Sequence, residues 1–168
     1  ENEVKELLWE LHKDYLGSVT LKTVNILKET FEIFDYILDQ KSEITNYSQP
    51  EKYLYEPNSA IMKSGGFDAV GSFYHLNKLH KHSHLYTSKD LILFPGRVFK
   101  IENSIPYSKL EMKIHLENKQ ANITTRNFPD TVENIRKKWK IKDGGNKYTF
   151  FTTDENNHKI VLICTKIK

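Results

Sequence analysis

Cysteine is nearly absent from this 168-residue chain, and long apolar runs are missing altogether. The single cysteine, Cys164, excludes a disulfide framework and a cysteine-based metal site, and it fits a reducing compartment such as the cytoplasm. No stretch of about 20 apolar residues is present, so we expect no transmembrane helix and no membrane partner. Glycine-rich phosphate loops and the G-x-S-x-G nucleophile elbow are also missing. The sequence therefore contains no recognisable catalytic centre.

The beginning of the chain carries no secretory signal, since it reads Glu-Asn-Glu-Val and places acid where a signal needs base. It also lacks an initiator methionine and starts inside a predicted helix, so we expect an excised piece of a longer protein. The length is typical of one domain or of two small ones. With 38% apolar and 12% aromatic residues, the chain is able to bury a core.

Charge is distributed unevenly along the chain. Residues 1–99 hold 11 Lys and Arg against 14 Asp and Glu, a net charge of −3. Residues 100–168 hold 14 against 8, a net charge of +6. A basic C-terminal part favours a polyanionic partner. A solvated lysine-rich surface is the alternative at this point, because 22 of the 25 basic residues are lysine.

Three kinds of segment are predicted in the first 52 residues. Apolar residues recur at helical spacing over residues 2–15, and Gly17 follows them. Residues 19–27 and 31–38 are rich in β-branched and aromatic side chains on either side of a short break, which predicts a hairpin. Residues 39–52 are polar and predict a loop or linker. A lone helix and hairpin cannot close a sheet, so we expect a neighbour to pack on them.

The middle of the chain is predicted to be mainly helical. Residues 53–57 form a short extended segment, after which Asn58 can cap a helix that runs to about residue 75. The strip around this cap is aromatic and contains a proline, and its acidic residue has no evident role in a core. We therefore predict that this strip meets another domain through Tyr53, Tyr55, Glu56 and Asn58.

The pattern is clearest after Gly96, where caps, glycine pairs and alternating apolar residues delimit each element. The strand of residues 159–167 is apolar on both faces, so we expect it to be central in a sheet. The order β-α-β-α-β-β predicts a compact α+β module. Its strands are predicted at residues 97–105, 120–127, 147–153 and 159–167, and its helices at residues 108–116 and 130–140.

Three alternating histidines are the best candidates for a metal site. His80, His82 and His84 would share one face of a strand, where their imidazoles could converge on one cation. No carboxylate or thiol stands close in sequence to add a ligand. A structural turn is therefore the favoured interpretation, and no metal is predicted.

Basic residues are concentrated around the second helix of the module. Val132, Ile135 and Trp139 form its apolar stripe, so the neighbouring bases face solvent. Five bases within seven positions repel one another, and a nucleic-acid backbone would offset that repulsion by releasing counterions. We predict RNA contacts by Arg97, Arg126, Arg136, Lys137, Lys140 and Lys142. For Arg126, pairing with a local acid remains open.

Five strings of residues carry a resemblance to a known family: 53–63 (YLYEPNSAIMK), 84–88 (HLYTS), 94–99 (FPGRVF), 121–129 (ANITTRNFP) and 142–145 (KDGG). The chain resembles a bacterial group of class I S-adenosylmethionine-dependent methyltransferases that carry a THUMP-like domain at the C-terminus. THUMP domains are RNA-binding modules of tRNA-modifying enzymes.

The resemblance implies an α+β fold with three parts. Residues 1–40 would be a small ferredoxin-like piece that follows an absent catalytic domain. Residues 41–95 would be a linker and helical connector, and residues 96–168 a THUMP-like RNA-binding module. The upstream methyltransferase domain would bind S-adenosylmethionine and supply catalysis, so we expect no cofactor and no activity in this piece alone.

The resulting prediction is a non-catalytic fragment that binds and positions RNA, with tRNA and rRNA both open as targets. A protein-interaction or structural module without nucleic-acid binding is the alternative, in which the basic helix meets an acidic surface. A stand-alone metal-dependent enzyme built on the three histidines is the third interpretation.

Overall fold

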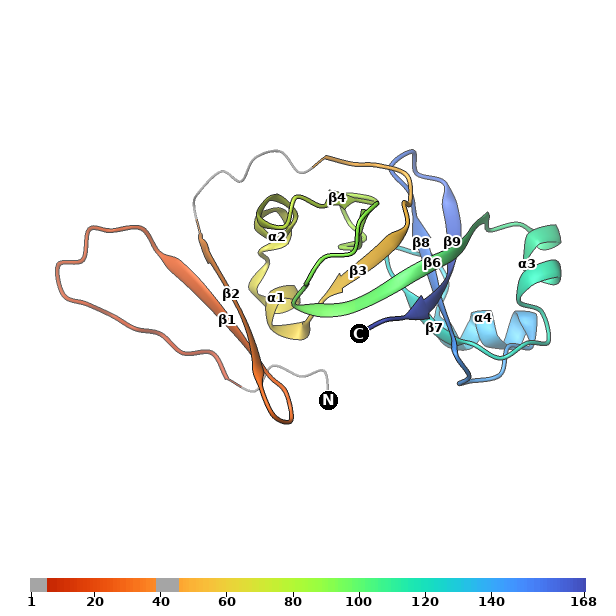
Figure 1. Ribbon diagram of the computed structural model, residues 1–168, viewed down its shortest axis with the longest axis horizontal. Coiled ribbons are helices and arrows are strands. Elements are labelled where there is room, and N and C mark those ends of the chain that lie inside the picture. Colours follow the sequence, from red (N-terminus) through yellow and green to blue (C-terminus); the bar gives the residue numbers. More distant parts are fainter. Residues whose placement is uncertain (1–5, 39–45) are drawn as a thin grey trace.

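The computed structural model of the protein describes residues 6–38 and 46–168 (Figure 1). Within these residues, no helix is long and apolar enough to cross a membrane. The elements are β1 (Thr20–Ile26), β2 (Phe31–Ile37), β3 (Tyr53–Pro57), α1 (Ser59–Ser64), α2 (Phe67–Phe73), β4 (Asn77–Lys78), β5 (Tyr86–Ser88), β6 (Gly96–Pro106), α3 (Lys109–His115), β7 (Asn122–Thr125), α4 (Val132–Trp139), β8 (Lys147–Thr153) and β9 (Lys159–Lys166).

A seven-stranded sheet forms the centre of the molecule, with the strand order β4-β5-β3-β6-β9-β8-β7. Its neighbouring strands are antiparallel except for β7 and β8, which are parallel. β9 lies between β6 and β8, as its apolar residues predicted. β1 and β2 form a separate antiparallel hairpin.

The predicted α+β module after Gly96 is confirmed element by element. Both of its helices begin at side-chain caps: Ser108 accepts a hydrogen bond from the Glu111 backbone N–H, and Thr131 accepts one from that of Asn134. Each cap satisfies a backbone donor that the first turn of a helix leaves unpaired. These local signals explain why the sequence places α3 and α4 correctly.

The two faces of the sheet are covered differently. At one end of one face, α3 and α4 pack on β8 and β9 through residues such as Met112, Ile135 and Phe151. A second cluster joins α1 and α2 to β3, β5 and β6 around Tyr55 and Val98. The third cluster includes Phe99 and Leu162 and is closed by the loop between β4 and β5. The helices thus lie toward the two ends of the sheet, as Figure 1 shows.

The region 41–95, expected as a linker and helical connector, belongs to the same sheet. It contributes β3, β4 and β5, and β3 pairs with β6 over its whole length. The predicted helix from Asn58 to about residue 75 is divided into α1 and α2, because Gly65 adopts a left-handed conformation with φ of 80°. The sequence misses β4 and β5 because each is only two or three residues long.

The predicted helix over residues 2–15 is not formed in its described part, residues 6–15. Leu7, Leu8 and Leu11 are exposed, so their apolar stripe has no surface to pack on. The β1–β2 hairpin is confirmed and is anchored to the body by its inner face. Tyr36 donates a hydrogen bond to the Ser64 carbonyl at 2.7 Å, and Phe34 joins the core around α1 and α2.

Candidate functional site

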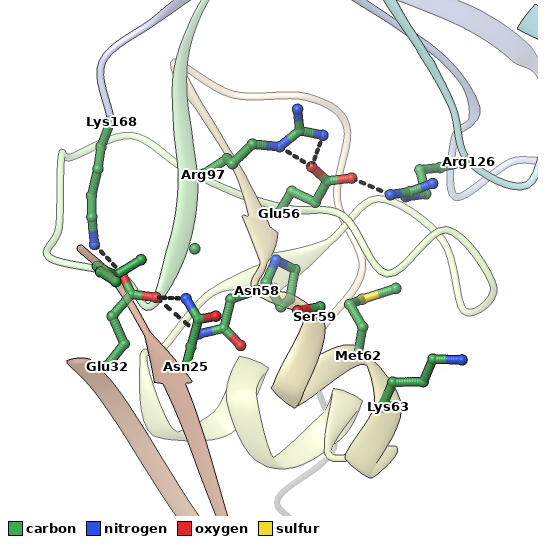
Figure 2. Close-up of a pocket in the computed structure, with 13 residues that line it drawn as sticks. Asn25, Glu32, Glu56, Asn58, Ser59, Met62, Lys63, Arg97, Arg126 and Lys168 are labelled. Atoms are coloured by element: carbon green, nitrogen blue, oxygen red, sulfur yellow. Dashed lines mark hydrogen bonds and ion pairs between the residues drawn. The ribbon is translucent and has the colours of Figure 1, made fainter. Parts of the chain in front are cut away.

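A polar pocket of about 540 Å³ opens where several distant parts of the chain meet (Figure 2). Its walls come from the β1–β2 hairpin, the end of β3, α1, the start of β6, the residue after β7 and the C-terminal residue. Charged side chains of both signs line it: Glu32, Glu56, Lys63, Arg97, Arg126 and Lys168.

Glu56 lies between two arginines and is almost completely buried, with 4% of its side chain exposed. Arg97 on β6 donates from Nε to Glu56 Oε2 at 2.6 Å, and its Nη2 also contacts that oxygen. Arg126 Nη2 lies 2.6 Å from Glu56 Oε1. One carboxylate therefore neutralises only one of two guanidinium charges, which leaves a local net charge of +1.

Glu32 forms the second carboxylate of the pocket and connects the hairpin to the body. It accepts hydrogen bonds from Asn25 at 3.0 Å and from Asn58 at 2.9 Å, and Lys168 donates to its other oxygen. Burial by itself raises the pKa of Glu32, but the hydrogen bonds from Lys168, Asn58 and Asn25 outweigh it, so the pKa is lowered overall. Glu32 therefore stays ionised at neutral pH.

A second basic surface, separate from the pocket, is formed by lysines of α4 and of the residues directly after it. Lys137, Lys140 and Lys142 are exposed, and no ion pair in the described part of the chain uses their ammonium groups. Lys140 ends the helix in a left-handed conformation with φ of 53°. We call these three residues the lysine face.

The predicted RNA contacts therefore divide into two groups. The lysine face is open to solvent, whereas all three arginines bind carboxylates of the chain itself. Arg136 donates to Asp143 at 2.5 Å and to two backbone carbonyls, one directly before β7 and one shortly after α4. Arg126 pairs with an acid, as one of the two interpretations held, but the acid is Glu56 and not a local one.

The strip predicted to meet another domain is mostly internal. Tyr55 is fully buried, and its hydroxyl group hydrogen-bonds Ser88 and the Asp90 carbonyl. It therefore presents no surface to a neighbour. Glu56 and Asn58 are also buried but reach the polar pocket, whereas Tyr53 is partly exposed.

The three alternating histidines do not converge on one point. His80 Nδ1 accepts hydrogen bonds from Asn127 and from the His82 backbone, so its Nε2–H donates to Asn157. His84 stacks on Phe67 with ring centroids 3.6 Å apart. Among the described residues, no group of three potential ligands could hold a metal ion. His80 instead joins the β4–β5 loop to the C-terminal module.

Sequence reasoning missed Glu32, Asn25 and Lys168 as members of the site. Glu32 and Lys168 are separated by 136 positions in the chain, and no motif surrounds either of them. Only folding brings these residues within hydrogen-bonding distance of one another.

Comparison with known proteins identifies two domain families in this chain. Residues 53–95 match a ferredoxin-like domain family, and residues 96–166 match a THUMP domain-like family. The chain thus carries a ferredoxin-like domain followed by a THUMP-like domain, and the predicted THUMP-like part is confirmed. We expected the ferredoxin-like piece at residues 1–40, whereas the match lies on β3, β4, β5, α1 and α2.

One solved structure resembles most of the chain. It is a crystal structure of a protein from Porphyromonas gingivalis W83 that is provisionally named a methyltransferase. The sequences are 35% identical, the TM-score is 0.81, and the similarity covers 89% of this chain. It covers 38% of the P. gingivalis protein, so the present chain corresponds to well under half of that protein. Among curated proteins, none matches this chain.

Proposed function

We propose that the chain is the RNA-binding part of an S-adenosylmethionine-dependent methyltransferase that acts on RNA in the cytoplasm. The lysine face carries the proposal. Three exposed ammonium groups without ion-pair partners among the described residues lie on a THUMP-like domain, and neutralising phosphates releases counterions from the nucleic acid. Phosphate contacts of this kind position a strand and carry little sequence information.

Methyl transfer itself is assigned to a separate catalytic domain, which would bind the cofactor. The P. gingivalis protein supports this division, because it contains a large part that this chain does not match. Within this chain we assign no residue to methyl transfer. S-adenosylmethionine is therefore not expected to bind the 168-residue chain, and calorimetry can measure whether it does.

Contact with the catalytic domain is best placed on the outer face of the β1–β2 hairpin. Val24 pairs with Ile33 across the strands, Ile26 pairs with Phe31, and all four side chains are exposed. A two-stranded hairpin with an open apolar face is only marginally stable alone, so a covering domain would stabilise it. A methyltransferase domain is the proposed occupant, because the similar protein is provisionally named a methyltransferase and contains a large part that this chain does not match.

The RNA-binding proposal is tested by removing the lysine face. Lys137→Gln, Lys140→Gln and Lys142→Gln are combined in one variant, and tRNA and rRNA fragments are titrated at two salt concentrations. We expect weaker binding to all sequences alike and a salt slope smaller by about 1 for each phosphate that the variant no longer neutralises. Unchanged affinity and slope in a folded variant would exclude this face from RNA binding.

A matched control removes the same charge elsewhere. Lys22, Lys28 and Lys89 are also exposed and lie outside the C-terminal module, so their triple glutamine variant should bind RNA nearly as the wild type does. Heparin serves as a polyanion that is not a nucleic acid. Equal binding of heparin and RNA would indicate generic charge attraction and would favour the protein-interaction alternative.

A further inference from the structure

We propose that the polar pocket binds a phosphate monoester carried on a nucleoside, which is either a free mononucleotide or the 5′-phosphorylated end of an RNA. The RNA form rests on the function proposed above, whereas the mononucleotide form is independent of it. The site is distinct from the lysine face, because none of its three lysines lines the pocket.

The charge of the pocket selects the ligand class. Its lining contains four cationic side chains and two carboxylates, an excess of two positive charges: Lys63, Arg97, Arg126 and Lys168 against Glu32 and Glu56. A phosphate monoester carries about −1.5 to −2 at neutral pH, whereas each phosphodiester of a nucleic-acid backbone carries one negative charge. A monoester therefore balances the pocket, and an internal phosphate balances only half of it. Low-dielectric walls strengthen this preference.

Donors for the phosphate remain available on both arginines. Figure 2 shows Arg97 and Arg126 approaching Glu56 from opposite sides. Glu56 engages Nε and Nη2 of Arg97, so Nη1 is not used by this carboxylate. Glu56 engages Arg126 through Nη2, and the Arg126 side chain is about one-third exposed. Hydrogen bonds from a guanidinium group to a phosphate are charge-assisted and therefore stronger than hydrogen bonds between neutral groups.

The rest of the pocket accommodates the nucleoside. Its volume of about 540 Å³ lies within the range of roughly 300–1,000 Å³ that small-molecule sites occupy. Leu27, Pro57 and Met62 supply an apolar wall for a base and sugar. Lys63 is exposed beside this wall and lies apart from the two arginines (Figure 2), so its charge adds to the pocket without disturbing the buried ion pairs.

Calorimetry with four small probes on the 168-residue chain tests the pocket: inorganic phosphate, adenosine 5′-monophosphate, cyclic 3′,5′-adenosine monophosphate and adenosine. The cyclic compound is the matched control, since it keeps the base and sugar but holds a phosphodiester with one charge. We expect the monophosphate to bind at least about tenfold more tightly than the cyclic form, the difference that one charge-assisted hydrogen bond provides. Adenosine alone should bind most weakly. Equal affinity for the monoester and the cyclic diester, or no binding of the monophosphate, overturns the proposal.

Two variants test which side chains hold the bound phosphate. Arg126→Lys keeps the charge opposite Glu56 but removes the planar guanidinium group, and it should weaken monophosphate binding about tenfold. Lys63→Gln changes an exposed residue that makes no ion pair with the described part of the chain, so it should lower affinity without affecting folding. If both variants bind the monophosphate as the wild type does, the phosphate is not held here and the proposal fails.

RNA oligonucleotides of one sequence, with a 5′-phosphate or a 5′-hydroxyl, distinguish the two sources of the phosphate. Tighter binding of the phosphorylated end that Arg126→Lys abolishes identifies an RNA end as a ligand of the pocket. Equal binding of both oligonucleotides together with monophosphate binding identifies the free nucleotide. The variant lacking the lysine face should bind the monophosphate normally, so a failure of the RNA-binding proposal is separable from a failure of this one.

Discussion

Replacement of Glu56 by glutamine probes how the ferredoxin-like and THUMP-like domains are held together. Glu56 lies in β3 of the first domain, whereas Arg97 and Arg126 belong to the second. Glutamine keeps the size of the side chain but removes the charge that both guanidinium groups face. Removing one partner of a fully buried ion pair costs about 3–5 kcal/mol. Because the arginine side chains are about one-third exposed, solvent screening reduces this cost, and we expect Glu56→Gln to lower the free energy of unfolding by about 2–3 kcal/mol.

Urea denaturation measures this change. With a slope of about 2 kcal/mol per molar for a chain of this size, the midpoint should fall by about 1–1.5 M urea. Asp143→Asn is the matched control: its carboxylate also pairs with an arginine but is 81% exposed, so its loss should cost about 0–1 kcal/mol. A double-mutant cycle of Glu56→Gln with Arg126→Gln should give a coupling energy of at least about 1 kcal/mol. If Glu56→Gln shifts the midpoint no more than Asp143→Asn, or if the cycle is additive, the buried ion pairs do not couple the domains.

Two further predictions concern glycine positions in the backbone and the pH dependence of the free energy of unfolding. A Cβ atom on Gly96 would lie 2.2 Å from the Glu56 carbonyl oxygen, so Gly96→Ala should lower the free energy of unfolding by about 2–4 kcal/mol. At Gly65, where φ is 80°, a Cβ atom would meet only open space, so Gly65→Ala should lower it by about 1 kcal/mol. Thermal denaturation measures both changes. Burial, followed by the nearby charge of Lys78, lowers the pKa of His84 to about 4. The unfolded chain then binds more protons between pH 6.5 and 4, so stability should fall by roughly 1–2 kcal/mol as the pH decreases through that window, after allowance for solvent screening. His84→Asn, which tolerates the left-handed backbone at φ of 52°, should remove this part of the pH dependence; an identical pH profile in the variant would contradict the assignment.

Local signals in the sequence were sufficient for the elements of the C-terminal module. Side-chain caps, the apolar stripe of α4 and the alternating residues of β8 and β9 act over a few positions, so each element could be predicted from its own residues. The resemblance also indicated the THUMP-like domain, which the family match confirms. The prediction of a helix over residues 2–15 is wrong for the opposite reason. Its apolar stripe needs a packing partner that the described chain does not supply.

Tertiary structure alone decided which charges are free and which are paired. In the sequence, nothing distinguishes the arginines of the module from its lysines. Folding, however, brings a carboxylate to each arginine: Arg97, Arg126 and Arg136. Ion pairs form between residues as far apart as Glu32 and Lys168, and no local pattern encodes such a distance. The sequence determined that the module is basic, because its net charge is the sum of the charges of its residues. The fold determined that the arginines and two carboxylates build a pocket while the lysine face stays open, because pairing depends on which side chains share a space.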